Sequence, residues 1–251
     1  MNIKGNTILI TGGATGIGFA LAQTLLKAGN QVIICGRREV KLKEAKQKLP
    51  QIQIRVCDVA KEKERAALFN WVKEKYPGLN ILINNAGIQK MIDLKKGRTD
   101  LVKGENEIET NLVAPIRLSA YFIPWFLQQH DKETAIINVS SGLGFVPIAV
   151  MPVYCASKAA LHSYTFSLRY QLKDTSVKVF EIIPPAVDTD LGKSSPDEES
   201  DYKGIPPSEV AEAVLKAIEK NQYEIAVGES KGLVATVGAD FQQAFENMNR
   251  W

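Results

Sequence analysis

The sequence lacks a long hydrophobic run. Nowhere among its 251 residues does an apolar stretch approach the length that spans a membrane. The apolar run in the opening stretch MNIKGNTILITGG is soon followed by glycines, and it is too short for the core of a signal peptide. We therefore expect a cytoplasmic protein without a membrane partner.

Cysteine and histidine are also scarce. The three cysteines, Cys35, Cys57 and Cys155, form no Cys-x-x-Cys motif, and one stays unpaired in any disulfide scheme. The two histidines, His130 and His162, do not belong to a cluster with ligand spacing. These absences argue against a metal site, against a disulfide-stabilised fold and against catalysis by a Ser-His pair.

Charge of one sign is not concentrated anywhere in the chain. The 31 Lys and Arg residues and the 28 Asp and Glu residues are scattered, and the net charge is +3. Because nucleic-acid-binding proteins usually show a clustered basic stripe, we do not expect nucleic acid as a partner. The apolar fraction of 45% and the charged fraction of 24% are those of a globular chain, and this length suits a single domain over residues 1–251.

Short apolar runs alternate with helix-patterned segments along the chain. The runs do not alternate apolar with polar residues, which is typical of strands buried on both faces of a parallel sheet. We therefore expect an α/β fold, a Rossmann-like doubly wound parallel sheet of about seven strands with helices on both faces. The expected strands are 6–11, 31–36, 52–57, 79–84, 134–139, 177–183 and 223–228, and the expected helices are 17–29, 39–49, 61–76, 99–128, 153–173 and 208–220, with a helical pattern again in the tail after 232.

Residues 190–207 form a candidate substrate loop. The segment is rich in Ser, Pro, Gly and charge, and it is longer than the usual connection between a strand and a helix. It follows the carboxyl end of the strand at 177–183, and ligands of open α/β sheets bind at that edge. A solvated surface loop is the alternative interpretation.

The first expected strand is followed by the glycine-rich stretch TGGATGIG, Thr11 to Gly18. Glycines at 12, 16 and 18 permit a tight turn and a close approach of backbone to ligand, and the N–H groups at the start of the next helix attract an anion. The stretch lacks the Gly-Lys-Ser/Thr ending of a nucleoside triphosphate loop. It predicts a cradle for a dinucleotide pyrophosphate, although a purely structural turn would also use glycine.

The end of the second strand bears on which dinucleotide binds. An acidic residue there would bond a ribose 2′-hydroxyl, but the chain reads ICGRRE, with Gly36 followed by Arg37 and Arg38. The planar donor fork of arginine suits a 2′-phosphate. We therefore expect NADP(H) to be preferred and NAD to remain possible; in the alternative, the arginines pair with Glu39 or Glu44.

The stretch VYCASKAAL places Tyr154 and Lys158 four positions apart. On a helix, residues i and i+4 lie on one face about 6 Å apart along the axis, so both heads can reach one bound molecule. This spacing permits cooperation between the phenol and the ammonium. It also occurs on partly exposed helix faces without any function.

Four motifs now stand in order: TGGATGIG, NNAG at Asn84 to Gly87, Asn111 in ETNLVAP, and Ser141 thirteen residues before the tyrosine of YCASK. This arrangement resembles the classical short-chain dehydrogenase/reductase family over nearly the whole chain. Within the family, the chain is similar to bacterial oxidoreductases associated with D-alanine transfer to teichoic acids. The segment IPPAVDT at Ile183 to Thr189 resembles the Pro-Gly-x-Val-x-Thr segment of the family, with Pro185 in place of the glycine.

The resemblance implies roles for individual residues. Tyr154 would be the acid and base, Lys158 its electrostatic partner and ribose contact, Ser141 the substrate orienter and Asn111 a member of a proton relay. Ser140 is the rival of Ser141, and Asn111 alternatively bonds within its own helix. The residues implied in cofactor binding are Gly12, Thr15, Gly16, Ile17, Gly18, Arg37, Arg38, Asp58, Asn85, Ala86, Gly87, Tyr154, Lys158, Pro184, Val187 and Thr189.

The function implied by the resemblance is a short-chain NAD(P)-dependent dehydrogenase or reductase. With NADP(H) it would interconvert a carbonyl and a secondary alcohol by hydride transfer, because the cofactor supplies the hydride that no side chain provides. Apolar residues from Gly142 to Met151, together with Ile88, Pro185 and the loop at 190–207, suit a small or medium apolar substrate. In the alternative, the same residues belong to the core or to a subunit contact. The family also implies a homodimer or homotetramer. The alternative function is an NADPH-binding sensor or interaction protein without turnover.

Overall fold

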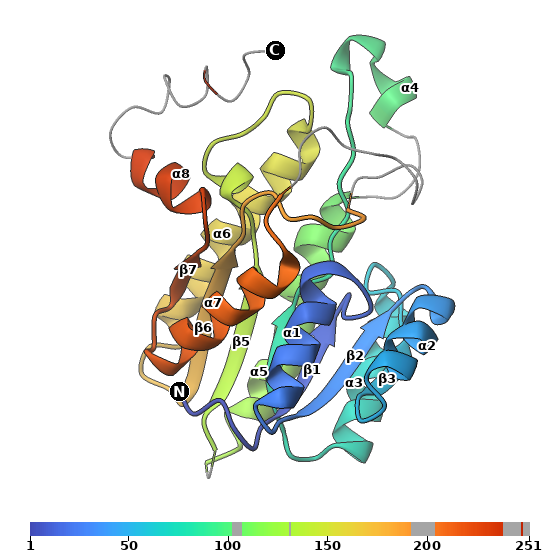
Figure 1. The fold of residues 1–251 in the computed structure, drawn as a ribbon, viewed down its shortest axis with the longest axis vertical. Coiled ribbons are helices and arrows are strands. Elements are labelled where there is room, and N and C mark those ends of the chain that lie inside the picture. Colours follow the sequence, from blue (N-terminus) through green and yellow to red (C-terminus); the bar gives the residue numbers. More distant parts are fainter. Residues whose placement is uncertain (102–106, 131, 192–203, 238–246, 248–251) are drawn as a thin grey trace.

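A single seven-stranded parallel sheet forms the centre of the molecule (Figure 1). The computed structural model describes residues 1–101, 107–130, 132–191, 204–237 and 247. The strands follow the order β3-β2-β1-β4-β5-β6-β7 across the sheet. Their bounds are β1 Thr7–Thr11, β2 Gln31–Gly36, β3 Gln53–Val56, β4 Leu79–Asn84, β5 Thr134–Val139, β6 Val177–Ile183 and β7 Glu224–Ala226.

Helices cover both faces of this sheet. Side chains of α1, α2 and α7 pack in one buried cluster, and side chains of α3, α5 and α6 pack in a second cluster on the opposite face. The fold is therefore the doubly wound α/β type that the alternating pattern predicts, and that prediction is confirmed. The helices are α1 Gly16–Lys27, α2 Glu39–Lys48, α3 Glu62–Lys75, α4 Arg98–Leu101, α5 Ala114–Phe126, α6 Pro152–Gln171, α7 Pro207–Glu219 and α8 Ser230–Thr236, with shorter turns η1 Leu94–Lys96, η2 Glu109–Val113 and η3 Gly142–Gly144.

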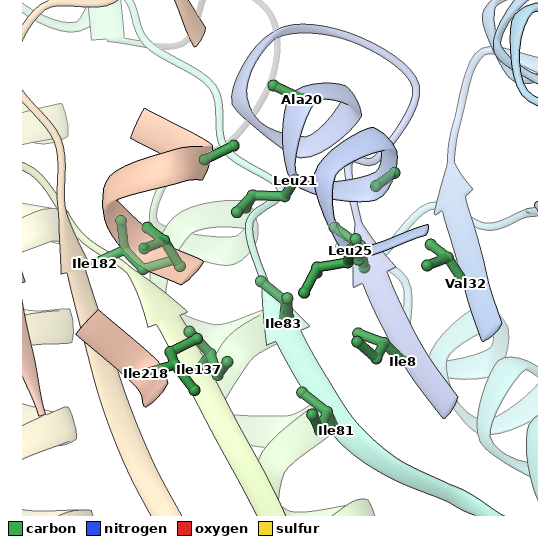
Figure 2. Close-up of a cluster of buried hydrophobic side chains, with 14 of the residues drawn as sticks. Ile8, Ala20, Leu21, Leu25, Val32, Ile81, Ile83, Ile137, Ile182 and Ile218 are labelled. Atoms are coloured by element: carbon green, nitrogen blue, oxygen red, sulfur yellow. The ribbon is translucent and has the colours of Figure 1, made fainter. Parts of the chain in front are cut away.

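Aliphatic side chains hold the first helix against the sheet. Leu21 and Leu25 of α1 belong to the same buried cluster as Ile8, Ile83 and Ile137 of the central strands (Figure 2). Fully burying a side chain of this size contributes roughly 1.5–3 kcal/mol. Because α1 begins at the glycine-rich turn, this packing also sets the position of the turn above the strand ends.

The segment expected to form one helix over 99–128 is built differently. It contains α4, the π-helical turn η2 and α5, while residues 102–106 lie outside the described part of the chain. Pro115 has no N–H to donate to the carbonyl of Asn111, and its ring would clash with that carbonyl. The N–H of Ala114 donates instead to the carbonyl of Glu109, five residues earlier. The resulting π turn contains Asn111, and such turns occur often at functional sites.

Two further expected features lie partly outside the described residues. The candidate substrate loop is described only at its ends. The expected tail helix is described as α8, and its apolar residues Phe241, Phe245 and Met248 lie outside the described part of the chain. Ile205, near the end of the candidate substrate loop, forms a bridge with Val187, which lies just before its start. The loop therefore leaves and rejoins the body of the protein at one place.

Candidate active site

The candidate site lies at the carboxyl edge of the sheet. The strand order reverses between β1 and β4, because the chain adds β2 and β3 on one side of β1 and the later strands on the other. Ligands of open α/β sheets bind in the crevice outside such a reversal. The glycine turn, NNAG, Ser141 and Pro184 follow the strands β1, β4, β5 and β6 respectively, so four of the motifs come together at this edge.

The glycine-rich turn is packed so tightly that side chains would not fit. Gly12 and Gly16 have φ angles of 64° and 55°, in the region that favours glycine. A Cβ added to Gly18 would lie 2.4 Å from the carbonyl oxygen of Gly12. Thr15, the N-cap residue of α1, makes no side-chain capping hydrogen bond. The turn thus leaves a bare backbone cradle at a helix N-terminus, which fits the pyrophosphate of a dinucleotide.

Thr11 joins this turn to the NNAG segment. Its hydroxyl oxygen accepts hydrogen bonds from the N–H groups of Asn85 and Ala86, both at 3.0 Å. The side-chain amide of Asn85 donates to the carbonyl oxygens of Thr11 at 2.9 Å and of Gly12 at 3.1 Å. Sequence reasoning did not single out Thr11, although its place at the end of β1 beside the glycines is a usable signal.

The two arginines lie exposed at the end of β2. A guanidinium nitrogen of Arg38 donates to the hydroxyl of Thr15 in the glycine turn at 3.5 Å. Nothing lies within 4 Å of a Cβ built on Gly36, so there is room for a ligand beside them. The carboxylates considered as alternative partners bond lysines: Glu39 pairs with Lys43, and Glu44 with Lys41, each at 2.8 Å.

Asp58 lies past the end of β3, on the same edge as the arginines. One of its carboxylate oxygens accepts a hydrogen bond from the N–H of Ala60 at 3.0 Å, and Lys61 lies 3.9 Å from the other. The side chain is therefore held in a turn at this edge. Its predicted contact with a cofactor stays a prediction.

Tyr154 and Lys158 lie one turn apart near the start of α6, with exposed fractions of only 5% and 4%. The ammonium of Lys158 donates to the carbonyl oxygen of Val139 at 2.8 Å and lies 5.7 Å from the centre of the Tyr154 ring. Helical spacing alone would also suit an exposed face. Burial of both groups instead places a phenol and an ammonium together in a low-dielectric environment.

Burial changes the acidity of these two groups in opposite directions. It raises the pKa of Tyr154 to about 12, and a hydrogen bond with the Ser141 side chain acts against this rise. It lowers the pKa of Lys158 to about 8, and the attraction of Glu181 acts against this fall. Both shifts arise because burial disfavours the charged form of each group. At neutral pH the pair is therefore a neutral phenol beside a protonated amine.

The structure distinguishes the two neighbouring serines. The side chain of Ser141 forms the hydrogen bond with Tyr154, and its oxygen also accepts from the N–H of Leu143 at 3.1 Å. The hydroxyl of Ser140 is directed to the carbonyl oxygen of Ile182 in β6, 3.4 Å away. Ser141 is therefore the serine beside the tyrosine, in agreement with its spacing in the sequence.

Asn111 is fully buried in the π turn and connects the NNAG loop to α6. Its side-chain oxygen accepts from the N–H of Ile88 at 2.9 Å, and its amide donates to the Ile88 carbonyl at 2.8 Å and to the Ser157 hydroxyl at 3.1 Å. Ser157 in turn donates to the carbonyl of Tyr154 at 2.7 Å. Ser157 was not predicted, because its role depends on the contact between the two helices.

Gly87 and the segment from Pro184 to Thr189 complete the edge. A Cβ on Gly87 would lie 3.6 Å from the Lys158 ammonium, and one on Gly16 would lie 2.9 Å from a side-chain carbon of Thr189. Pro184 accepts a hydrogen bond from the N–H of Gly142 through its carbonyl, at 3.1 Å. Pro185, which replaces the usual glycine, is accommodated without a cis peptide, since the described residues contain none.

Metal-binding clusters and membrane-spanning helices are both absent from the described residues. Within them, no group of three or more His, Cys, Asp and Glu side chains is arranged to hold a metal ion. None of the helices in that part of the chain is long and apolar enough to cross a membrane.

Comparisons with known proteins agree with this geometry. Residues 6–200 match the family model for short chain dehydrogenases. The chain is 50% identical over 250 residues to the uncharacterized oxidoreductase DltE of Bacillus subtilis, covering 99% of this chain and 98% of DltE. A short chain dehydrogenase from Burkholderia cenocepacia in complex with NADP has 25% identity and a TM-score of 0.81, with 100% of both chains covered.

A further solved structure has a similar fold. It is a short chain dehydrogenase/reductase from Burkholderia phymatum in complex with NAD, with a TM-score of 0.82 and 20% identity, covering 100% of this chain and 97% of that one. The family resemblance drawn from the ordered motifs is therefore confirmed. This chain belongs to the short chain dehydrogenase family and is an oxidoreductase.

Proposed function

We propose that the protein is an NADP(H)-dependent oxidoreductase that interconverts a carbonyl compound and a secondary alcohol, with Tyr154 as the general acid and base. The observation that carries this proposal is the burial of Tyr154 beside Ser141 and Lys158 at the edge that also holds the glycine cradle. A sensor without turnover would need the cradle, but it would have no need for a buried phenol and ammonium on one helix face.

The chain offers a site that fits a dinucleotide. The cofactor would supply the hydride, a chemistry that no side chain can provide. The bare turn at Gly12, Gly16 and Gly18 would hold the pyrophosphate against the start of α1. Arg37 and Arg38, exposed beside the open space at Gly36, would bond a 2′-phosphate, which supports the preference for NADP(H) over NAD. A relative's NADP complex is consistent with this proposal.

The remaining implied contacts lie around the same edge. Thr189 lies against Gly16 and would contact the carboxamide end of the cofactor, while Asp58 would lie near the adenine. The other residues that we assign to the cofactor are Thr15, Ile17, Asn85, Ala86, Gly87, Pro184 and Val187.

Tyr154 would move the proton in this reaction. In the direction of reduction, negative charge develops on the carbonyl oxygen, and the phenol donates its proton there while Ser141 bonds the same oxygen. A phenol with a pKa of about 12 is a weak acid at neutral pH. The ammonium of Lys158 stabilises the phenolate that is left, because an opposite charge nearby favours the charged form. Asn111 would link this group to the proton supply through its contacts with Ile88 and Ser157.

The walls around Tyr154 favour a small or medium apolar substrate. The loops after β4 and β5 are joined by a hydrogen bond of 2.9 Å from the N–H of Ile92 to the carbonyl of Val150. Leu143, Ile148 and Ile88 on these loops are partly exposed apolar residues near the site. The candidate substrate loop at 190–207 ends beside this edge of the sheet, because Ile205 forms a bridge with Val187 of the Pro184–Thr189 segment.

Replacement of Tyr154 by phenylalanine tests the central assignment. Tyr154→Phe keeps the ring and removes the hydroxyl, so we expect turnover of an accepted carbonyl compound to fall at least ~100-fold, as for loss of a general acid. Calorimetric binding of NADPH should stay within a few-fold. Tyr170→Phe, the same change at an exposed position of α6, is the matched control. Unchanged turnover in Tyr154→Phe would rule out this tyrosine as the acid.

A further inference from the structure

A row of polar side chains crosses the sheet beneath α5 and α6. Asn84, Asn138 and Glu181 are register partners on β4, β5 and β6. Along β6, Val177 and Val179 pack in the cluster of α5 and α6, whereas Phe180 and Ile182 pack in the opposite cluster. Glu181 therefore faces α6, because alternate residues of a strand share a face. A carboxylate in such a place needs partners, since burying an unpaired charge is very costly.

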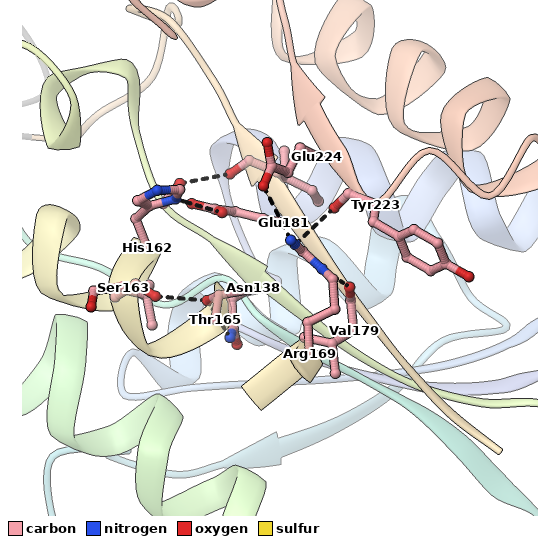
Figure 3. Close-up of polar contacts among 12 residues, drawn as sticks. Asn138, His162, Ser163, Thr165, Arg169, Val179, Glu181, Tyr223 and Glu224 are labelled. Atoms are coloured by element: carbon pink, nitrogen blue, oxygen red, sulfur yellow. Dashed lines mark hydrogen bonds and ion pairs between the residues drawn. The ribbon is translucent and has the colours of Figure 1, made fainter. Parts of the chain in front are cut away.

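His162 is the direct partner of this carboxylate. The Nδ1 atom of His162 lies 2.9 Å from one carboxylate oxygen of Glu181 and 3.1 Å from the other (Figure 3). The side chain of Glu181 is 0% exposed, while that of His162 is 29% exposed. The hydrogen bond to Glu181 raises the pKa of His162. The pair thus connects a buried strand position to the surface of α6.

Lys158 is the second cation near Glu181. It precedes His162 by one turn of α6, so that the two side chains share a face of the helix. Its ammonium bonds the carbonyl of Val139, and Val139 is the register partner of Ile182, the residue after Glu181. This placement brings Glu181 close enough to attract the Lys158 ammonium. The attraction acts against the lowering of the Lys158 pKa by burial.

The other charged groups around Glu181 are already paired. Arg169 of α6 lies 3.1 Å from Glu224 of β7 and also donates to the carbonyls of Val179 and Tyr223. Glu224 is the register partner of Glu181. Its negative charge raises the pKa of His162, whereas the positive charge of Arg169 lowers it. Asn138, the register partner on β5, is a neutral amide that donates to Thr165. His162 and Lys158 are therefore the cations that balance Glu181.

His162 also touches the loop that carries Ser141. The centre of its ring lies 4.4 Å from that of Phe145. Phe145 is the C-cap residue of η3, and Ser141 is the N-cap residue of the same turn. His162 thus contacts the carboxylate of Glu181 and also packs against Phe145, at the end of the turn η3 that Ser141 begins.

We propose that Glu181 and His162 are positioning residues for Lys158. The carboxylate of Glu181 keeps Lys158 in its ammonium form inside the protein, and protonated His162 shares the charge of that carboxylate at lower pH. As the pH rises and His162 loses its proton, Glu181 acts on Lys158 alone, so Lys158 stays charged over a wider pH range. The catalytic consequence rests on the proposed role of Lys158 beside Tyr154, but the electrostatic coupling does not.

NMR titration of Lys158 tests this coupling without a substrate. The full-length protein would be labelled with ¹³C at the ε-carbon of lysine, and Lys158→Arg would identify the resonance. Glu181→Gln keeps the shape and removes the charge, so we expect the Lys158 titration midpoint to fall by at least ~0.5 pH units, a roughly threefold loss of proton affinity. Glu224→Gln is the matched control on the neighbouring strand and should leave the midpoint in place.

His162→Gln gives a second, independent readout. In the wild-type protein, we expect the Lys158 resonance to show a smaller inflection where His162 titrates, and His162→Gln should remove it. If Glu181→Gln fails to fold, this inflection decides the matter. A Lys158 midpoint that does not move in Glu181→Gln, an equal shift in Glu224→Gln, or an inflection that persists in His162→Gln would each overturn the proposal.

Turnover then separates this inference from the proposed function. Since Lys158 must be protonated to stabilise the phenolate, Glu181→Gln should move the alkaline limb of the kcat profile to lower pH by the same amount as the Lys158 midpoint. If the midpoint moves while Tyr154→Phe leaves turnover unchanged, the coupling stands and the assigned chemistry fails. If the midpoint does not move while Tyr154→Phe abolishes turnover, the chemistry stands and the coupling fails.

Discussion

At the scale of single residues, the site depends on charged groups removed from water. Lys158 and Glu181 are almost completely buried, and each has a defined partner: the Val139 carbonyl for the ammonium and His162 for the carboxylate. A partner matters because losing it leaves a buried charge uncompensated. Arg37 and Arg38 differ, since both lie exposed at the surface. Their contribution should therefore appear in ligand binding rather than in folding.

Removal of both arginines should change which cofactor binds. In Arg37→Ser/Arg38→Ser, we expect NADPH affinity to fall at least ~10-fold, because hydrogen bonds to charged groups contribute roughly 1.5–3 kcal/mol each. NADH affinity should change little. Calorimetry at fixed salt concentration measures both, and Arg55→Ser on β3 is a control for general loss of positive charge. Equal losses of NADPH and NADH affinity would contradict the assignment of a 2′-phosphate site.

At the scale of elements, close packing at the start of α1 explains why glycine recurs there. The tight contact is between Gly18 in the first turn of the helix and the backbone of Gly12 in the preceding loop. The aliphatic packing of α1 on the central strands prevents the helix from moving away. The distance between α1 and the central strands therefore sets how much space the glycine turn has.

Alanine at position 18 should disturb both stability and binding. A Cβ there would lie 2.4 Å from the Gly12 carbonyl oxygen and 2.5 Å from the Asn85 amide. Overpacking of this kind typically costs 1–3 kcal/mol, so we expect Gly18→Ala to lower the free energy of unfolding by about that amount and to weaken NADPH binding.

Gly232→Ala in α8 is the matched control for this change. Nothing lies within 4 Å of the Cβ that it would add. Since alanine is favoured over glycine in helices, this variant should be as stable as the parent or up to ~1 kcal/mol more stable. Urea unfolding measures both variants. Equal stability of Gly18→Ala and the parent would show that the turn has more room than the structure indicates.

At the scale of the whole molecule, α6 presents large apolar side chains to solvent. Phe166 and Tyr170 are 60% and 67% exposed and lie one turn apart on the helix that carries Tyr154 and Lys158. Exposed aromatic pairs of this kind favour protein contacts. We propose a homodimer or homotetramer that buries this part of α6 against a second copy. Such an assembly would also hold α6 in place.

Serine at both positions should weaken that assembly. We expect light scattering to give the wild-type protein a mass of two or four chains, each of 27.7 kDa, and Phe166→Ser/Tyr170→Ser a lower mass. Val40→Ser removes another exposed apolar residue, 68% exposed on α2, and should leave the mass unchanged. A wild-type protein that runs as a single chain would contradict the proposal, as would an assembly that survives the double replacement.

Much of the fold could be predicted because its signals are local. Strands such as Leu79–Asn84 and Thr134–Val139 are continuous apolar runs, and their observed bounds are those expected. The helix over 99–128 was predicted less well, because Pro115 shifts the hydrogen-bond pattern into a π turn around Asn111. Tyr154, Lys158 and Ser141 could be predicted together because their spacing belongs to an ordered set of motifs, and the structure places Ser141 and Lys158 as neighbours of Tyr154.

The sequence by itself determined the kind of elements, their order and the family, since hydrophobic patterning and motif spacing act over short stretches of chain. Only the tertiary structure decided which polar groups are buried and what they bond. Thr11 meets Ala86 across 75 positions, and His162 meets Glu181 across 19. These contacts depend on which strands are neighbours and which face a helix covers. The cost of burying a charge, and hence the pKa of Lys158, is settled only when distant segments pack together.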